Sequence, residues 1–158
     1  MAERTHGTGN EGRMKAEGSR LMVLGAQLAR KSLLWWFAVL VWAVALWILS
    51  ANPSLHSGPS FPLKDKLLHC IYFCGGASCL LIALFGKASP VPAWRTLVLR
   101  SLLFTAIIGA LDEFHQTFTP GRSGNDPWDW LADVTGGVLA AWIVGRLLIK
   151  VGRYSRHS

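Results

Sequence analysis

Charge is scarce in this sequence, and the scarcity is uneven. Charged residues make up only 16% of the 158 residues, whereas a soluble domain has about 25%. Residues 32–63 contain no Asp, Glu, Lys or Arg at all. A stretch of this length argues against an ordinary soluble domain, because charged side chains lie at the surface of such domains.

Cysteine is also scarce, and its placement excludes a disulfide framework. Cys70, Cys74 and Cys79 form an odd set within one apolar run, which is not the pattern of a disulfide-stabilised secreted domain. Cys70 and Cys74 have i, i+4 spacing, so a thiolate metal site with His69 is one alternative. Free cysteine usually behaves as a small buried hydrophobe, and we favour that interpretation.

Apolar residues are abundant, at 51%, and most lie in four runs: 33–51, 67–85, 96–118 and 130–149. A helix needs about 20 such residues to cross a bilayer core, and only helices or closed barrels satisfy their backbone in lipid. We therefore predict an all-α polytopic membrane protein, a four-transmembrane-helix bundle. The first run is longer than a signal-peptide core and follows a hydrophilic tail, so we expect an uncleaved anchor.

The sequence divides into a membrane domain and two basic tails. We expect residues 1–30 to form a largely disordered cytoplasmic tail, because its first 20 residues are rich in Gly, charge and small polar groups. Residues 31–151 form the predicted four-helix membrane domain. Residues 152–158 form a basic cytoplasmic C-terminal tail.

The net charge of +7 has a topological explanation. With four crossings, the tails and the loop after the second run share one side of the membrane, which carries thirteen Lys and Arg against three on the other side. The positive-inside rule then places both termini in the cytoplasm. We expect a multi-pass protein of the cell (inner) membrane with the bilayer as its partner and no nucleic acid. The basic residues on the outer side are Lys64, Lys66 and Arg122.

Asp65 and His69 begin the second predicted helix with i, i+4 spacing, so they share a face. Lys66 lies about 100° further round the helix. For Lys66 alone, a solvated interfacial position with a snorkelling side chain is the simpler interpretation. For His69, one turn deeper in the bilayer, we expect a functional contact.

Glu113 and Gln116 are i, i+3 neighbours near the end of the third run, on a face that continues as Gly109 and Ala106. Small residues allow close helix approach, so this face should look into the bundle. A carboxylate facing lipid costs roughly 2.5–3.5 kcal/mol, so Glu113 should face protein or water. We expect the neighbouring Asp112 and His115 to be structural or solvated.

The segment 119–126 (TPGRSGND) has the composition of a loop. Asp126 followed by Pro127 is typical of an N-cap and first helical residue, and the helix N-terminus favours Asp129. Asp133 lies one turn deeper on a face of small residues that includes Gly136, Gly137, Ala140, Ala141 and Gly145. An acid on such a packing face inside the membrane is a candidate functional residue, and we expect Arg122 and His69 to be its partners.

These observations predict one polar binding pocket on the extracytoplasmic side. Arg122 could engage carboxylates or a ligand phosphate through two parallel hydrogen bonds, and Trp128 and Trp130 would flank the pocket in an aromatic belt. The predicted binding residues are Asp65, Lys66, His69, Glu113, Gln116, Arg122, Asp126, Asp129 and Asp133.

The order of these polar pieces resembles the VanZ-like family of small bacterial membrane proteins. The resemblance covers roughly residues 65–140. It rests on five short motifs: Asp65-Lys66-x-x-His69, Glu113-x-x-Gln116, Pro120-x-Arg122, Asp126-x-x-Asp129 and Asp133-x-x-Gly136. Many members have Asn at the position of Asp133 and Gly at that of Ala140; the extra charge at Asp133 favours an ion or a cationic partner.

The resemblance implies a link to low-level resistance against the glycopeptide teicoplanin. We predict a protein that binds a lipid-linked or glycopeptide-like envelope ligand. Whether it is an enzyme stays open: a metal-assisted enzyme acting on a lipid phosphate would use Glu113 or His69 as general base. We expect no cofactor in the first case and Mg²⁺, Ca²⁺ or Mn²⁺ in the second.

A purely structural polar network that holds the helices together is the third alternative. A transporter is disfavoured, because no acid or base is evident in the inner half of any predicted helix to complete a path.

Overall fold

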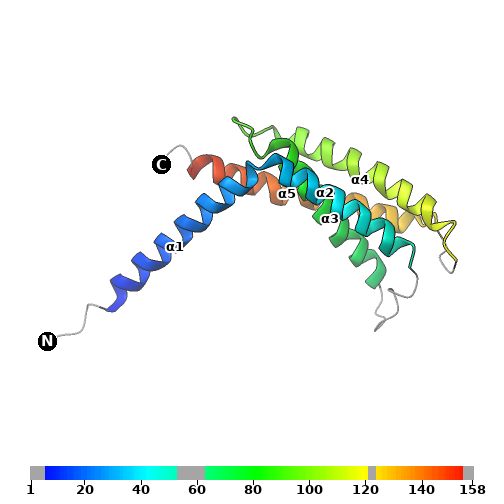
Figure 1. The fold of residues 1–158 in the computed structure, drawn as a ribbon, viewed down its shortest axis with the longest axis horizontal. Coiled ribbons are helices and arrows are strands. Elements are labelled where there is room, and N and C mark those ends of the chain that lie inside the picture. Colours follow the sequence, from blue (N-terminus) through cyan, green and yellow to red (C-terminus); the bar gives the residue numbers. More distant parts are fainter. Residues whose placement is uncertain (1–5, 53–62, 121–123, 155–158) are drawn as a thin grey trace.

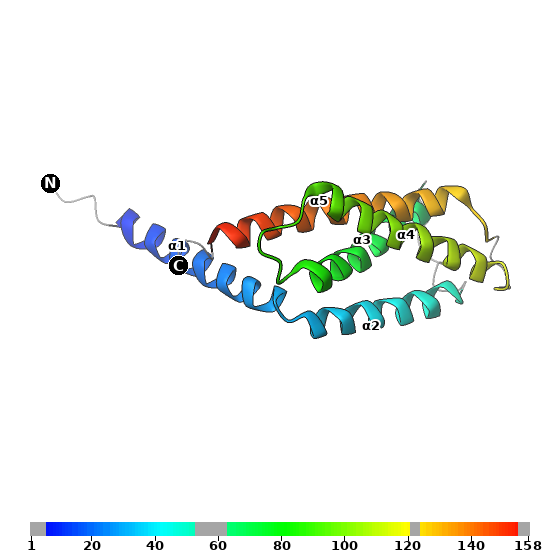
Figure 2. The same cartoon turned by 90° about the horizontal axis from the view of Figure 1, so that it is seen from above.

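The computed structural model describes residues 6–52, 63–120 and 124–154, and all regular structure within them is helical. The helices α2 to α5 run alongside one another as an elongated bundle, and α1 projects from one end (Figures 1 and 2). The bounds are α1 (His6–Ala29), α2 (Ser32–Ser50), α3 (Lys64–Phe85), α4 (Trp94–Gln116) and α5 (Pro127–Tyr154).

Three of the described helices are long and apolar enough to cross a membrane, namely α2, α3 and the segment Pro127–Gly152 of α5. The predicted count of four is not confirmed, because α4 is not among them. Four charged residues lower the hydropathy of α4: Arg95, Arg100, Asp112 and Glu113. It lies within the bundle and packs along α5 (Figure 2).

The prediction of a largely disordered N-terminal tail is wrong for the described residues, because α1 begins at His6. Its second half is rich in Ala, Leu, Met, Gln and Arg, which favour helix, and Arg13 pairs with Glu17 one turn on, at 3.1 Å. The Trp35 side chain of α2 donates a hydrogen bond to the Leu28 carbonyl at 2.9 Å. The Leu28 carbonyl also accepts the Lys31 N–H at 3.0 Å, so the Trp35 bond is a second one at the C-terminal end of α1 and ties α2 to it.

α5 is the central helix and packs most extensively against α3 and then against α4. The predicted small-residue face of α5 is confirmed, since every member is buried: Gly136, Gly137, Ala140, Ala141 and Gly145. A Cβ atom on Gly136 would overlap the backbone carbonyl of Cys70 on α3. The missing side chain therefore allows the two backbones to approach at this point.

The half of the bundle nearer α1 has an apolar core, whose buried members are Leu81, Leu97, Ala141, Val144 and Leu148. These residues come from α3, α4 and α5, so α4 lies antiparallel to α5 along its length. Beside this core, the Ser101 hydroxyl donates to the Gly137 carbonyl at 2.6 Å and joins α4 to α5. The opposite half of the bundle is polar inside.

The helix α2 packs on α3 through a reciprocal pair of aromatic side chains. Trp42 Nε1 donates to the Tyr72 carbonyl at 2.9 Å, and the Tyr72 hydroxyl donates to the Trp42 carbonyl at 3.1 Å. The two rings stack with centroids 5.5 Å apart. These hydrogen bonds and the stacked rings fix the register of α2, whose residues are otherwise largely exposed.

Candidate functional site

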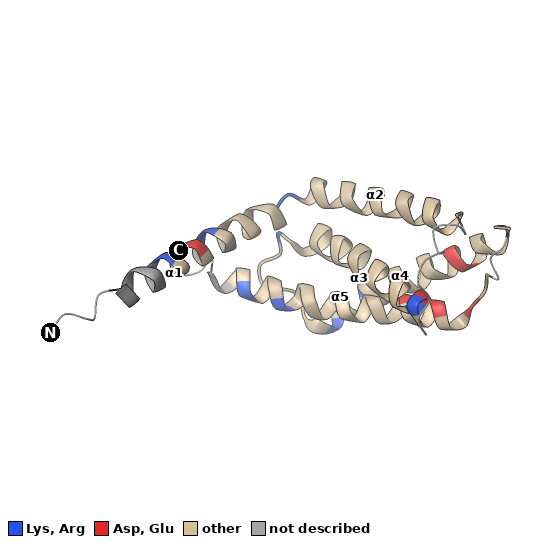
Figure 3. Ribbon diagram, turned by 90° about the horizontal axis from the view of Figure 1, so that it is seen from below, with Lys and Arg blue, Asp and Glu red and all other residues tan. Residues whose placement is uncertain are grey.

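The acidic residues of the bundle gather at the end of the bundle farthest from α1 (Figure 3). They come from the first turns of α3 and α5 and the last turns of α4, which meet there because α4 runs antiparallel to α3 and α5. We call this group the polar cluster. Its members are Asp65, Lys66, His69, Asp112, Glu113, Gln116, Asp126, Asp129 and Asp133.

Lys66 joins α3 to the start of α5 across the surface of the polar cluster. Its ammonium lies 2.6 Å from Asp126 and 2.7 Å from Asp129. The hydrogen bond from Lys66 lowers the pKa of the Asp126 carboxyl below its ordinary value of 3.8. Asp126 also accepts a hydrogen bond from the Trp128 N–H at 2.8 Å, which confirms the predicted N-cap of α5. The expectation that Lys66 is simply solvated at the interface is wrong, because its side chain is only 28% exposed and two acids at the start of α5 pair with it.

Asp133 and His69 form the deepest contact of the polar cluster. His69 Nδ1 lies 2.9 Å from Asp133 Oδ1, as the sequence predicted, and the two residues are 8% and 0% exposed. The other carboxylate oxygen, Oδ2, packs against Gly109 of α4, where a Cβ atom would lie only 2.6 Å from it. Oδ2 has no hydrogen-bond partner in the part of the chain that the structure describes. Gly109 therefore makes room for the acid.

Two adjacent acids at the end of α4 both face inward. Asp112 and Glu113 are 6% and 4% exposed. Gln116 Nε2 donates to Asp112 Oδ2 at 2.8 Å, and the backbone N–H of Asp126 donates to Glu113 Oε2 at 2.7 Å. One oxygen of each carboxylate is thus held by a neutral donor, which orients the acid without neutralising it.

Two sets of side chains in the polar cluster are close enough to share a bound cation. One atom each from Asp65, His69 and Asp129 lie within 4.8 Å of one another, and so do one atom each from His69, Asp112 and Glu113. His69 belongs to both sets and so lies at the centre of the cluster. Carboxylate and imidazole groups together are ligands for divalent metal ions.

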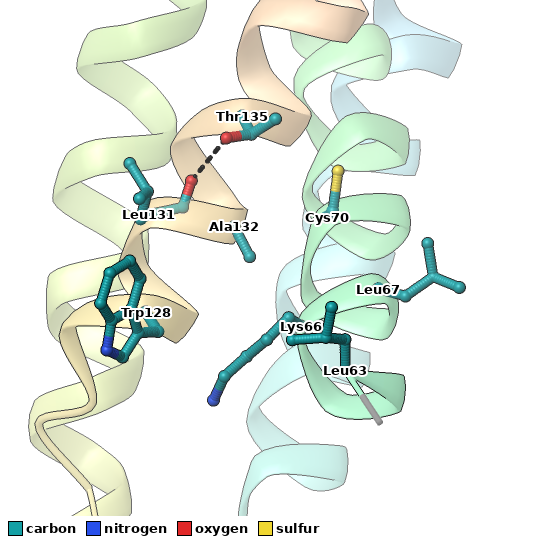
Figure 4. A pocket seen from close by; sticks show the side chains of 8 residues that line it. All are labelled: Leu63, Lys66, Leu67, Cys70, Trp128, Leu131, Ala132 and Thr135. Carbon is teal, nitrogen blue, oxygen red and sulfur yellow. Dashed lines mark hydrogen bonds between the residues drawn. The ribbon is translucent and has the colours of Figure 1, made fainter. Parts of the chain in front are cut away.

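An apolar groove of about 590 Å³ lies between α3 and α5 beside the polar cluster. Figure 4 shows Lys66 extending across its polar end from α3 toward α5. The Thr135 hydroxyl is bonded to the Leu131 carbonyl at 2.8 Å and so adds little polarity. The groove is lined by Leu63, Lys66, Leu67, Cys70, Trp128, Leu131, Ala132 and Thr135. It extends along α3 and α5 from Cys70 and Thr135 to Lys66.

The structure brings together every predicted binding residue that it describes; Arg122 lies outside the described residues. Asp112 was expected to be structural or solvated; it is buried and hydrogen-bonded to Gln116, and it was missed as a member of the polar cluster. Its i, i+4 spacing to Gln116, which was predicted to face inward, could have revealed it. His115 is half-buried, and its ring stacks on Trp47 of α2 with centroids 3.7 Å apart. It belongs to helix packing.

The predicted flanking residues take different positions. Trp128 is 67% exposed and lines the apolar groove, whereas Trp130 is 38% exposed and donates to the Ala106 carbonyl at 2.9 Å. All of the cysteines are free and half-buried. None of them joins a metal-capable set among the described residues, so the preferred interpretation of buried hydrophobes fits better than a thiolate site.

The arrangement of these motifs is that of a known family. The model of the VanZ/LLP1 family matches residues 35–149. The chain belongs to this family. The match begins within α2 and ends within α5, so it covers the bundle and the polar cluster and leaves out α1. No curated protein and no solved structure matches the chain significantly. Membership in the VanZ/LLP1 family and the three apolar helices make it a membrane protein.

Proposed function

We propose that this VanZ-family protein binds a lipid-linked envelope ligand at the extracytoplasmic face of the cell membrane. The hydrocarbon chain lies in the groove between α3 and α5, and the polar head reaches the polar cluster. The observation that carries the proposal is that the groove and the polar cluster are continuous. Lys66 lines the groove and also pairs with Asp126 and Asp129. A molecule with one apolar and one polar end fits such a site.

The sidedness follows from the charge distribution. The tails, the loop between α3 and α4 and the helix ends next to them carry thirteen of the 16 Lys and Arg residues, whereas the polar cluster holds nearly all of the acids outside α1. The positive-inside rule therefore favours an extracytoplasmic polar cluster. In this topology α4 crosses the membrane as a fourth span. Its charged residues are tolerated because Asp112 and Glu113 are enclosed by other helices.

The burial of the polar cluster favours a functional role over a purely structural one. A charged side chain inside a membrane protein is costly and usually marks a functional site, and helix packing here is already supplied by the small-residue face of α5. Several acids share the polar cluster with Lys66 and His69, so the polar cluster itself carries an excess of negative charge. Arg122 lies outside the described residues, and it stays a sequence-based candidate for binding a ligand phosphate.

The proposal predicts that filling the groove removes a bound lipid. In Ala132→Leu the larger side chain occupies the groove, so the lipid retained through purification in mild detergent should fall several-fold, as measured by mass spectrometry of extracts. Ala110→Leu, the same change at an exposed site on α4, should retain wild-type lipid. Arg122→Ala should weaken retention of phosphate-bearing lipids in particular.

The same variants have a readout in cells. The family resemblance links the site to glycopeptides, so susceptibility to teicoplanin should change in Ala132→Leu and not in Ala110→Leu. Identical lipid profiles and identical susceptibilities in all variants would contradict the proposal. If, in addition, Asp133→Asn changed the thermal stability but neither lipid retention nor susceptibility, the polar cluster would be a structural network that holds the helices together.

A further inference from the structure

Glu113 presents an unexplained buried oxygen. Its side chain is 4% exposed, and the Asp126 N–H occupies Oε2. Oε1 is buried and has no hydrogen-bond partner among the residues that the structure describes. A buried carboxylate oxygen without a partner calls for a ligand, such as a water molecule or an ion.

The surroundings of Glu113 favour a cation. Donor atoms of Glu113, Asp112 and His69 lie within 4.8 Å of one another. Two carboxylates this close repel each other in a medium of low dielectric constant, and nothing described in contact with either one is a permanent cation. A divalent ion would balance the charge of the two carboxylates, so the three side chains together with the ion would have no net charge.

His69 has a contact that supports metal binding. Its Nδ1 atom lies 2.9 Å from Asp133 Oδ1, which leaves Nε2 available to bind an ion when Nδ1 carries the proton. A carboxylate that bonds the second ring nitrogen of a histidine is the usual support for metal binding by the first. Gln116 and the Asp126 N–H support Asp112 and Glu113 in the same way. Each of the three side chains therefore has a supporting partner.

The other set in the polar cluster is a poorer site. It consists of Asp65, His69 and Asp129, and the Lys66 ammonium lies 2.7 Å from Asp129. A positive charge at that distance opposes a bound cation and already neutralises the acid. The two sets share His69, so only one of them can use its free nitrogen.

We propose that His69, Asp112 and Glu113 bind one divalent metal ion in the interior of the polar cluster. A mixed set of one imidazole and two carboxylates suits first-row ions such as Mn²⁺ and Zn²⁺. Three protein ligands leave coordination positions open for an exogenous oxygen. The ion would bind a phosphate oxygen of the lipid-linked ligand, which explains how an acid-rich cluster can accept an anionic head group.

This role for the ion rests on the proposed function, but metal binding itself requires no lipid. The two ideas can therefore fail separately. Metal content is measured on delipidated protein, whereas the lipid proposal is tested by groove variants. If the protein bound a metal ion but retained no lipid, the proposal of a lipid-linked ligand would be contradicted and the metal site would stand.

The test is metal titration of purified, chelator-treated protein with Mn²⁺ and with Zn²⁺. We expect about one ion per wild-type chain by elemental analysis after gel filtration, with a rise in thermal stability on addition. Asp112→Asn and Glu113→Gln should lose the ion. His115→Gln, which removes a histidine on the same helix outside the polar cluster, should keep it.

A milder variant guards against loss of folding. Asp133→Asn removes a supporting carboxylate and no ligand, so it should weaken metal affinity by about 10–100-fold while the protein stays folded. Wild-type protein that binds neither metal, or equal metal binding by wild type, Glu113→Gln and Asp133→Asn, would overturn the proposal.

Discussion

At the scale of single residues, the contacts that follow from the spacing of residues along one helix were predictable. The contacts that depend on how several helices pack around one helix end were not. The pairing of Asp133 with His69 was predicted because Asp133 lies on a packing face of small residues and His69 lies one turn into a predicted membrane helix, where each needs a polar partner. Asp112 and Glu113 lie about 100° apart on one helix. Only the packing of α2, α3 and α5 around the end of α4 reveals that both directions are enclosed.

The paired state of Lys66 could not be predicted for a similar reason. Its partners, Asp126 and Asp129, lie about 60 positions later in the chain. Their meeting depends on how α3 packs against α5, which no local pattern gives. The N-cap role of Asp126, in contrast, depends only on its neighbours, and it was predicted.

The ion pair of Lys66 with Asp126 has a defined pH dependence. The folded state lowers the pKa of Asp126 below 3.8, so the pair stabilises the protein above that pH and loses its contribution as the pH falls through the folded-state value. The effect is about 1 kcal/mol or less, because the pair is partly exposed. Thermal unfolding of wild type and Asp126→Asn in detergent measures it.

Asparagine is as good an N-cap as aspartate, so Asp126→Asn removes the charge and keeps the cap of α5. The difference in melting temperature between the two proteins should be constant from neutral pH down to about 4 and should shrink below that. A difference that stays constant or grows in acid would show that the Lys66 pair contributes nothing.

At the scale of helices, the composition of the sequence predicted which helix faces are buried more accurately than it predicted the number of helices. The small-residue face of α5 was recognised from its spacing, and each member is buried. α1 was missed because its glycines and charges are typical of disorder, although a run of good helix formers follows them. α4 was counted as a span because its apolar stretch is long, but its charged ends lower its hydropathy.

Gly136 and Gly75 provide a matched test of the contact between α3 and α5. A Cβ atom at Gly136 would overlap the Cys70 carbonyl, whereas one at Gly75 would meet no atom within 4 Å. Gly136→Ala should destabilise the protein by about 1–3 kcal/mol, the usual cost of overpacking. Gly75→Ala should be neutral or stabilising by up to about 1 kcal/mol, because alanine favours helix over glycine.

Unfolding in mixed micelles with increasing denaturing detergent measures both changes. The structure requires the two variants to differ in this order. Equal stabilities, or a more stable Gly136→Ala, would mean that the two backbones do not meet at Gly136.

At the scale of the whole molecule, the proposed function depends on the separation of acidic and basic residues to opposite ends of the bundle. The polar cluster lies at one end of the bundle, and α5 carries its basic residues toward the other (Figure 3). The proposed envelope ligand lies outside the cytoplasm, so the proposal requires the polar cluster to face that side. The proposed function therefore depends directly on the sidedness of the polar end.

Thiol labelling of intact cells tests this sidedness most directly. In a background in which Cys70, Cys74 and Cys79 are replaced by alanine, Pro120→Cys lies in the exposed loop after α4 and Lys87→Cys in the loop before it. A membrane-impermeant maleimide should label Pro120→Cys from outside and Lys87→Cys only after permeabilisation. Labelling of Lys87→Cys in intact cells, with Pro120→Cys protected, would place the polar cluster in the cytoplasm and contradict the account.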